Sequence, residues 1–433
     1  MATEEAGAPA PERTTTFREV FAVGEFRPLF GTFLLSTIGD ELARVALTVL
    51  VYARTSSPLL SAITFAISYL PWLLGGPFLS TLADRLPRHR VLIATDAARA
   101  VLVGLLAIPG MPLPVLLGLL FLVALCAPPF ESARSALMAD VMEGDRYAVA
   151  TSLTNISLQV AQVVGFLLAG ALLAGVGASA ALLLNALTFL VSAVWLSLGL
   201  QRRPAPVDPT SSAGASVWQH TLDGFRLIRR SPRLLAIIAV LWVATLFTYG
   251  SEGIAAPLVE QLGQGTTEVG VLLAANPLGV TLGGLAVARL VRADLRERLV
   301  PFLVVLSLAP LVLVGVVANL LPAGWLSYWM VVGLMFVSGL GAAWLIPLNV
   351  SFVQAVPASF RGRVYGVAVT GLYGMQGLGV LAAGLVAEGL APGGVVAVFG
   401  AVGLAAVAVP LIAYARTQGH MAAGRPAAGP SVS

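Results

Sequence analysis

The chain of 433 residues is 58% hydrophobic and only 11% charged, with a formal net charge of +4. A soluble domain carries about a quarter charged residues, so this composition excludes an ordinary soluble protein and indicates an integral membrane protein. All 25 basic residues are arginine, and the absence of lysine excludes a P-loop ATPase and Schiff-base chemistry.

Residues 1–26 are polar and lack the features of a cleaved signal peptide, so they are predicted to form an N-terminal tail. Apolar stretches of membrane-spanning length follow, and each is expected to be a helix because lipid offers no partners for unpaired backbone groups. Twelve such helices are predicted, near 29–52, 58–82, 91–109, 113–138, 148–175, 179–199, 233–259, 267–290, 299–320, 325–347, 363–387 and 393–415.

Arginines alternate between the predicted connections. They gather in the two tails, in the linker and in every even-numbered connection, whereas the odd-numbered connections contain only Arg54. Arginine-rich connections remain on the cytoplasmic side of a membrane, so both termini are predicted to be cytoplasmic. The protein is expected to be a multi-pass protein of the cell membrane, either an inner or a plasma membrane.

The sixth connection divides the chain into two sets of six helices. Residues 201–232 begin as a Pro/Ser/Ala-rich linker and continue into "VWQHTLDGFRLIRRSP", which predicts a short amphipathic helix, the alternative being disordered linker. The expected domains are therefore bundles at 27–200 and 233–416, with a C-terminal tail at 417–433. Val141 and Val356 lie in similar segments 215 residues apart, as do Arg146 and Arg361, which favours an internal repeat.

The segment "GGPFLSTLADRLPRHRV" after the second helix matches much of the signature G-x-x-x-D-R-x-G-R-[RK]. With twelve predicted helices and a long central linker, the chain resembles the major facilitator superfamily. The stretches "IGDELARVAL", "ESARSALMADV" and "ATSLTNISLQVAQVVG" resemble its bacterial macrolide- and siderophore-exporter branch. The resemblance implies an all-α membrane protein of two pseudo-symmetric six-helix bundles, working as a proton-coupled exporter of small, largely apolar molecules.

Three ionisable residues interrupt the first predicted helix. Asp40 lies twelve residues past Pro28, about 18 Å deep at a rise of ~1.5 Å per residue, near the middle of a ~30 Å membrane core. Arg44 can reach Asp40 or Glu41 on one helix face, which leaves one carboxylate in excess. Charges at this depth are candidates for proton or substrate binding, the alternative being a structural pair between helices.

Further candidates lie in other predicted helices. Glu252 is expected to titrate, to contact an outer gate or to reach the membrane surface. Polar and aromatic residues expected to line a broad binding cavity are Gln159, Asn276, Trp344 and Asn349. By resemblance, a cytoplasmic charge network that latches the two halves comprises Asp84, Arg85, Arg88, Arg90, Asp96, Arg99, Glu131, Arg134, Arg146 and Arg361, although arginines here also obey simple topology.

These features predict a secondary transporter that exports small amphipathic compounds in exchange for protons. The alternatives are an importer or facilitator of a small metabolite and a membrane scaffold or sensor without transport activity. An enzyme is not expected, because no nucleophile–base or metal-binding constellation is present in the sequence. The predicted partners are the substrate, protons and the lipid bilayer, with no cofactor, metal or nucleic acid, and the protein is expected to be a monomer.

Overall fold

The computed structural model describes residues 16–73, 86–204, 217–357 and 360–423, and every regular element in these ranges is a helix. The first half of the chain forms α1 (Phe17–Ala22), α2 (Phe26–Thr55), α3 (Pro58–Ala66), α5 (Arg88–Leu106), α6 (Leu113–Leu125), α7 (Ala127–Val141), α8 (Asp145–Gly175) and α9 (Gly177–Gly199).

The second half begins with α10 (Val217–Arg230), which lies within the linker. It continues with α11 (Pro232–Tyr249), the 3₁₀ turn η1 (Gly250–Ile254), α12 (Ala255–Gln261), α13 (Thr266–Leu290), α14 (Ala293–Arg296), η2 (Glu297–Leu299), α15 (Val300–Leu320), α16 (Trp325–Ala342), α17 (Leu345–Ala355), α18 (Arg361–Val386) and α19 (Pro392–Ala423).

Among these described residues, nine helical stretches are long and apolar enough to cross a membrane. Helices α2 and α5 have sufficient length, but every 18-residue stretch within them carries more than two charged residues. The predicted second span, 58–82, begins with α3 and runs into residues 74–85, which lie outside the described ranges. The protein is therefore an all-helical, multi-pass membrane protein, and the count of twelve spans stays a prediction.

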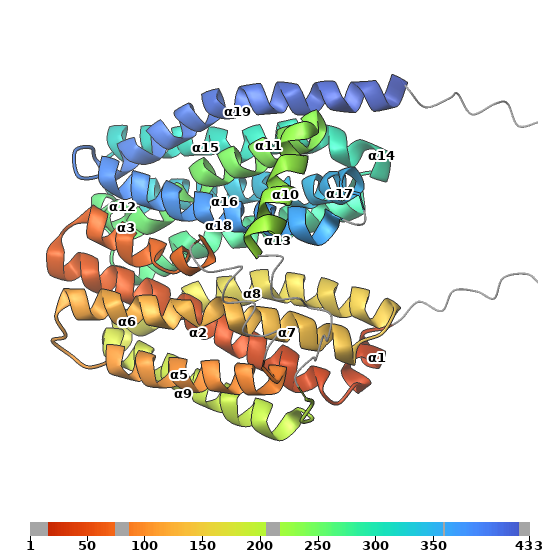
Figure 1. Ribbon diagram of the computed structural model, residues 1–433. Coiled ribbons are helices and arrows are strands. Elements are labelled where there is room, and N and C mark those ends of the chain that lie inside the picture. The colour runs from red at the N-terminus through yellow and green to blue at the C-terminus, as the bar shows by residue number, and fades with distance from the viewer. Residues whose placement is uncertain (1–15, 74–85, 205–216, 358–359, 424–433) are drawn as a thin grey trace, which may run out of the picture.

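The helices form two groups that follow the order of the sequence. Figure 1 shows α1 to α9, coloured red to yellow, on one side and α10 to α19, coloured green to blue, on the other. The two groups are joined where α8 packs against α13 and where α3 packs against α18.

The structure differs from the sequence predictions near both ends of the chain. Residues 17–22 form α1 inside the predicted N-terminal tail, because Val20 is buried in an apolar cluster with Phe26, Phe30 and Met138. Helix α19 continues to Ala423, beyond the predicted end of the last bundle at residue 416.

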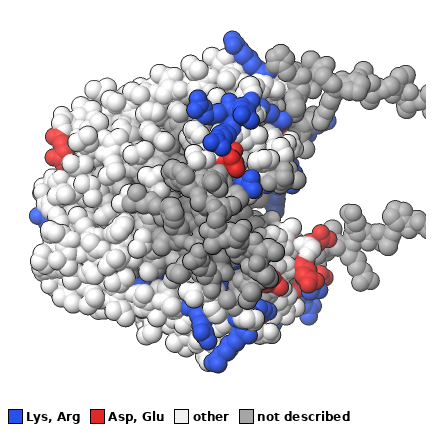
Figure 2. All heavy atoms as spheres, in the orientation of Figure 1, with Lys and Arg blue, Asp and Glu red and all other residues white. Residues whose placement is uncertain are grey.

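The two ends of the molecule differ in charge. Figure 2 shows basic side chains gathered at the end where α1 and the end of α19 lie, while most of the opposite end is uncharged. We call the first the arginine-rich end; it holds the starts of α5, α8 and α18, with Arg88, Arg146 and Arg361. The other, which holds Arg54 at the end of α2, is the arginine-poor end.

Backbones of the two halves meet closely at the arginine-poor end. A Cβ atom added to Gly270 of α13 would lie 2.3 Å from the carbonyl oxygen of Phe166 in α8, and one added to Gly170 would lie 2.4 Å from that of Thr267. A Cβ on Gly384 of α18 would lie 2.3 Å from the Ala62 side chain in α3. Only glycine permits these contacts, because any side chain would push the halves apart.

Hydrogen bonds reinforce this closure, and we call them the inter-half clasp. One Glu388 carboxylate oxygen, after α18, accepts the Ser57 hydroxyl at 2.7 Å and the Leu59 amide at 3.0 Å, at the start of α3. The Tyr52 hydroxyl donates to Glu260. Glu388 thereby caps a helix of the other half, since first-turn amides have no partner within their own helix.

We expect Glu388→Gln to loosen the clasp, because an amide oxygen is a weaker acceptor than a carboxylate. The bonds from Ser57 and Leu59 lower the pKa of Glu388, so the clasp should persist above the ordinary glutamate range and fail as the pH falls through the lowered pKa. Spin labels at Ala53→Cys and Leu390→Cys, in a Cys126→Ser background, report the separation. Glu268→Gln is the control, since that carboxylate bonds only Gly265 in its own half; equal widening in both variants would contradict the assignment.

Candidate functional site

A cavity of about 1560 Å³ lies between the two halves. Its walls come from α2, α7 and α8 on one side and from α11, η1, α13 and α18 on the other. It extends to the arginine-rich end, where Gly362 and Arg363 line it. The clasp and the close glycine contacts lie at the opposite end, so the halves are joined at the arginine-poor end and separated by the cavity at the other.

The buried centre of this cavity wall is an ion pair on α2. Arg44 Nη1 lies 2.9 Å from Glu41 Oε2, and Gln162 of α8 donates to the other Glu41 oxygen at 3.4 Å. Glu41 is only 3% exposed. Gly165 permits this depth, because a Cβ there would lie 2.7 Å from that of Glu41. The geometry assigns Arg44 to Glu41.

Asp40 is therefore the excess carboxylate of the triplet. It lines the cavity and is only partly buried. Within the described part of the chain, no hydrogen bond or ion pair is formed by its carboxylate. An acid in this position can exchange a proton or meet a cationic ligand without first breaking a pair.

Glu252 brings a second acid to the cavity from the other half. The 3₁₀ turn η1 interrupts the α11–α12 span, and Glu252 lines the cavity from this turn instead of reaching the membrane surface. The Tyr69 hydroxyl of the first half donates to it at 3.4 Å. The Arg44 guanidinium lies 5.5 Å from the centre of the Tyr69 ring, so a chain of contacts joins Glu41, Arg44, Tyr69 and Glu252 across the two halves.

Aromatic side chains complete the middle of the cavity. Trp72 stacks on Tyr373 of the other half, with ring centres 4.8 Å apart, and Tyr69 stacks on the same ring at 6.2 Å. All three line the cavity. The sequence prediction missed Tyr69 and Trp72, because nothing in the apolar segment "ISYLPW" distinguishes a cavity-lining aromatic residue from one that faces lipid.

The remaining predicted cavity residues divide into two pairs. Gln159 and Asn276 line the cavity, one from each half. Trp344 and Asn349 are not among the lining residues, which corrects the sequence expectation. Trp344 sits at the break between α16 and α17, where it is fully buried in the core of the second half. Asn349 is exposed on α17, away from the cavity.

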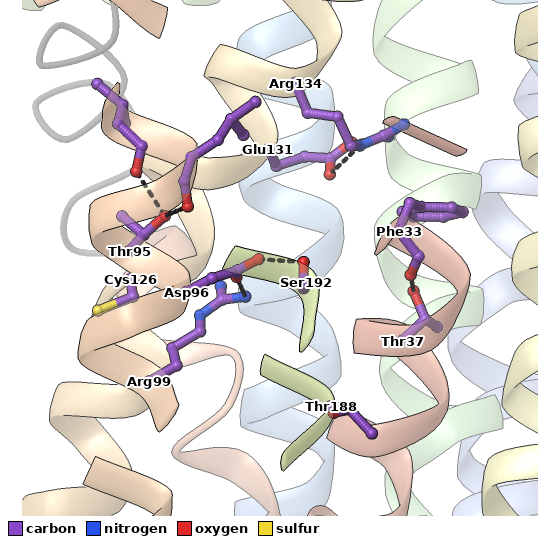
Figure 3. A network of polar contacts seen from close by, with 12 residues as sticks. Phe33, Thr37, Thr95, Asp96, Arg99, Cys126, Glu131, Arg134, Thr188 and Ser192 are labelled. Carbon is purple, nitrogen blue, oxygen red and sulfur yellow. Dashed lines mark hydrogen bonds and ion pairs between the residues drawn. The ribbon is translucent and has the colours of Figure 1, made fainter. Parts of the chain in front are cut away.

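Asp96 and Arg99 form a contact inside the first half, as Figure 3 shows. Asp96 is completely buried and accepts the Ser192 hydroxyl of α9, with Arg99 Nη1 at 3.8 Å. The Arg99 guanidinium lies over Phe130 and Phe189, 5.2 and 5.3 Å from the ring centres. Arg99 lines the cavity, but Asp96 ties α5 to α9 and does not face the second half.

Three more of the predicted network residues pair within the first half. Glu131 and Arg134 bind each other on α7 and line the cavity, with Arg134 stacked 4.2 Å from the centre of Phe33 (Figure 3). Arg88 binds Asp140, a partner that the sequence prediction missed. The exposed residues, which have no ion pair in the described ranges, are Arg90, Arg146 and Arg361; Asp84 and Arg85 lie outside those ranges. The expected latch between the halves is therefore not formed among the described residues, because the halves are apart at this end.

Known proteins resemble this chain in sequence. The profile of the Major Facilitator Superfamily matches residues 29–319. A Bacillus subtilis (strain 168) protein named an uncharacterized MFS-type transporter, YfiS, is 24% identical over 370 residues, which cover 82% of this chain and 86% of that protein. BacE of the same strain, for which bacilysin export is proposed, is 32% identical over 123 residues, covering 28% of this chain and 31% of BacE.

Solved structures resemble this fold along nearly the whole chain. A mutant of peptide transporter POT in complex with alafosfalin has a TM-score of 0.73 at 18% identity, covering 94% of this chain and 96% of POT. A mutant of the nucleoside transporter NupG has a TM-score of 0.71 at 13% identity, covering 89% of this chain and 100% of NupG. At these identities the likeness concerns the fold alone.

Proposed function

The chain belongs to the Major Facilitator Superfamily, and from this premise we propose that it exports small amphipathic compounds in exchange for protons. The observation that carries the proposal is Asp40, an acid that forms no ion pair with any described residue, in a cavity that also holds Glu252. By the arginine distribution, the arginine-rich end is the cytoplasmic one. The cavity of this conformation would then receive substrate from the cytoplasm.

Exchange follows from competition for one carboxylate. A cationic or hydrogen-bond-donating substrate beside Asp40 favours the deprotonated acid, and a proton favours the empty site. The carrier then moves substrate in one direction and a proton in the other, which couples the two opposite fluxes. Glu252 extends this competition to the second half, because Tyr69 links it to the Arg44 guanidinium.

The cavity walls suit an amphipathic ligand. Aromatic rings from both halves, including those of Trp72, Trp242 and Tyr373, offer apolar and stacking surfaces. The side-chain amides of Gln159 and Asn276 offer a few orienting hydrogen bonds. The volume of 1560 Å³ leaves room for a molecule of drug size together with water. The resemblance to BacE supports export in particular.

We expect Asp40→Asn to reduce pH-gradient-driven transport at least tenfold while the protein stays folded, because the amide cannot exchange a proton. The flux is measured in everted membrane vesicles whose lumen is made acidic. Uptake of the lipophilic cation ethidium into these vesicles reports the exchange. Asp145→Asn, an exposed acid at the start of α8, is the control. Unchanged flux in Asp40→Asn would remove Asp40 from the mechanism, and flux in the reverse direction would favour the importer alternative.

A further inference from the structure

A second, smaller pocket lies apart from the central cavity. Its volume is about 310 Å³, and it is formed where the start of α5 meets the end of α9. None of its lining residues lines the central cavity. In Figure 1, α5 and α9 lie at the edge of the first half that is farthest from the second half. The pocket therefore faces the surroundings of the protein and has no part in the transport route proposed above.

The pocket is strongly basic. Its polar lining consists of His89, Arg90, Arg202 and Ser197, and none of the described lining residues is an acid. Arg90 and Arg202 are exposed, and among the described residues neither has an ion-pair partner. The neighbouring Arg203 differs, because both its terminal nitrogens bind Glu25, at 2.6 and 2.8 Å. The positive charge of the pocket is thus uncompensated within the described chain.

His89 gives an independent indication that a ligand is missing. Its side chain is 9% exposed, and its Nδ1 atom is buried without a hydrogen-bond partner among the described residues. A buried polar atom left unpaired is destabilising, so such atoms are normally satisfied by a hydrogen bond. A ligand with acceptor oxygens, placed between His89 and the two arginines, would supply the partner.

The surroundings of the pocket are apolar. Ile93, Leu196 and Leu200 form its remaining lining. The outward face of α9 exposes Val191, Val194, Trp195 and Leu198, at 44, 51, 42 and 82%. Such a face in a membrane protein contacts acyl chains, with the arginines at the level of the headgroups. The basic pocket thus lies at the arginine-rich end of α9, a helix that exposes apolar side chains along its length.

We propose that this pocket binds the phosphate headgroup of an anionic phospholipid, whose acyl chains lie along the exposed face of α9. The two arginines neutralise the phosphate, and His89 donates to one of its oxygens. Basic pockets between membrane helices on the cytoplasmic side recognise such headgroups through this combination of charge and apolar contact. A soluble phosphate anion shares the headgroup chemistry but would not use the apolar face.

The test uses the full-length protein in detergent, titrated with phosphatidylglycerol or phosphatidylcholine and followed by native mass spectrometry and thermal unfolding. We expect phosphatidylglycerol to bind preferentially. Arg90→Gln/Arg202→Gln should weaken that binding about twenty-five-fold, since each basic residue near an anionic leaflet contributes about fivefold. The control, Arg289→Gln/Arg298→Gln, removes the same charge from exposed positions outside the pocket and should bind as wild type does.

Three results would overturn the proposal: equal binding of the two lipids, equal loss in the control variant, or protection by inorganic phosphate as strong as by phosphatidylglycerol. The last would identify a soluble anion as the ligand. If the double variant does not fold, His89→Phe tests the same site with the charge of the arginines retained. It should lower phosphatidylglycerol binding severalfold and leave phosphatidylcholine binding unchanged, and an unaltered preference in this variant would contradict the role of the pocket.

Discussion

Arg44→Gln is expected to destabilise the protein by about 3 kcal/mol, because it leaves the carboxylate of Glu41 buried without a cation. Glu41 is 3% exposed, and its remaining contact is Gln162 at 3.4 Å, so the neighbouring side chains offer no substitute charge. Thermal unfolding of the purified protein in detergent measures the loss. Transport should fall as well, since Arg44 also contacts the ring of Tyr69, which binds Glu252.

The double variant Glu41→Gln/Arg44→Gln separates the pair from its surroundings. It removes both charges and should recover most of the stability that the single variant loses. Arg54→Gln is a control on the same helix, because Arg54 is exposed and donates only to the Met111 carbonyl. If the double variant were as unstable as Arg44→Gln, the cause would be lost packing of Arg44 on Phe65 and Tyr69 and not an unpaired acid.

Gly270→Ala should have the second large effect, on the equilibrium between conformations. The added Cβ would lie 2.3 Å from the Phe166 carbonyl oxygen and 2.8 Å from the Gly170 amide nitrogen, so the backbones of α8 and α13 must separate. Overpacking of this kind costs about 1–3 kcal/mol, and the cost falls only on the conformation that is closed at the arginine-poor end. That conformation should lose about five- to 150-fold in relative population.

Labelling of a single cysteine at that end measures the change. With Cys126→Ser as background, a cysteine at Ala62, which contacts Gly384 across the two halves, should react faster with a water-soluble maleimide in Gly270→Ala. Gly333→Ala is the matched control, because a Cβ at Gly333 meets nothing within 4 Å. Equal reactivity in the two variants would show that the Gly170–Gly270 contact does not hold this end closed.

The particular residues show how far sequence reasoning reached. The sequence alone singles out Asp40, Glu41 and Arg44 as candidates, because ionisable side chains inside an apolar span are costly in any membrane fold. Which carboxylate Arg44 would bind could not be predicted, because both are within one turn of it; Gly165 and Gln162 on α8 favour Glu41. Trp344 and Trp72 are both tryptophans in apolar predicted helices and cannot be distinguished by sequence. Trp344 is buried in the core of the second half, whereas Trp72 lines the cavity.

The sequence by itself determined the all-helical membrane class and the presence of charged residues in the first span, since hydropathy and arginine placement depend on the bilayer and not on tertiary contacts. The superfamily resemblance was likewise visible in local motifs. Only the tertiary structure decided that Glu252 faces Tyr69 and that Glu388 caps α3. It also decided that Arg88 and the predicted latch pairs Asp96–Arg99 and Glu131–Arg134 form their contacts within the first half. Such pairings depend on how helices from distant parts of the chain are rotated and spaced, which the packing of glycines such as Gly170 and Gly270 determines.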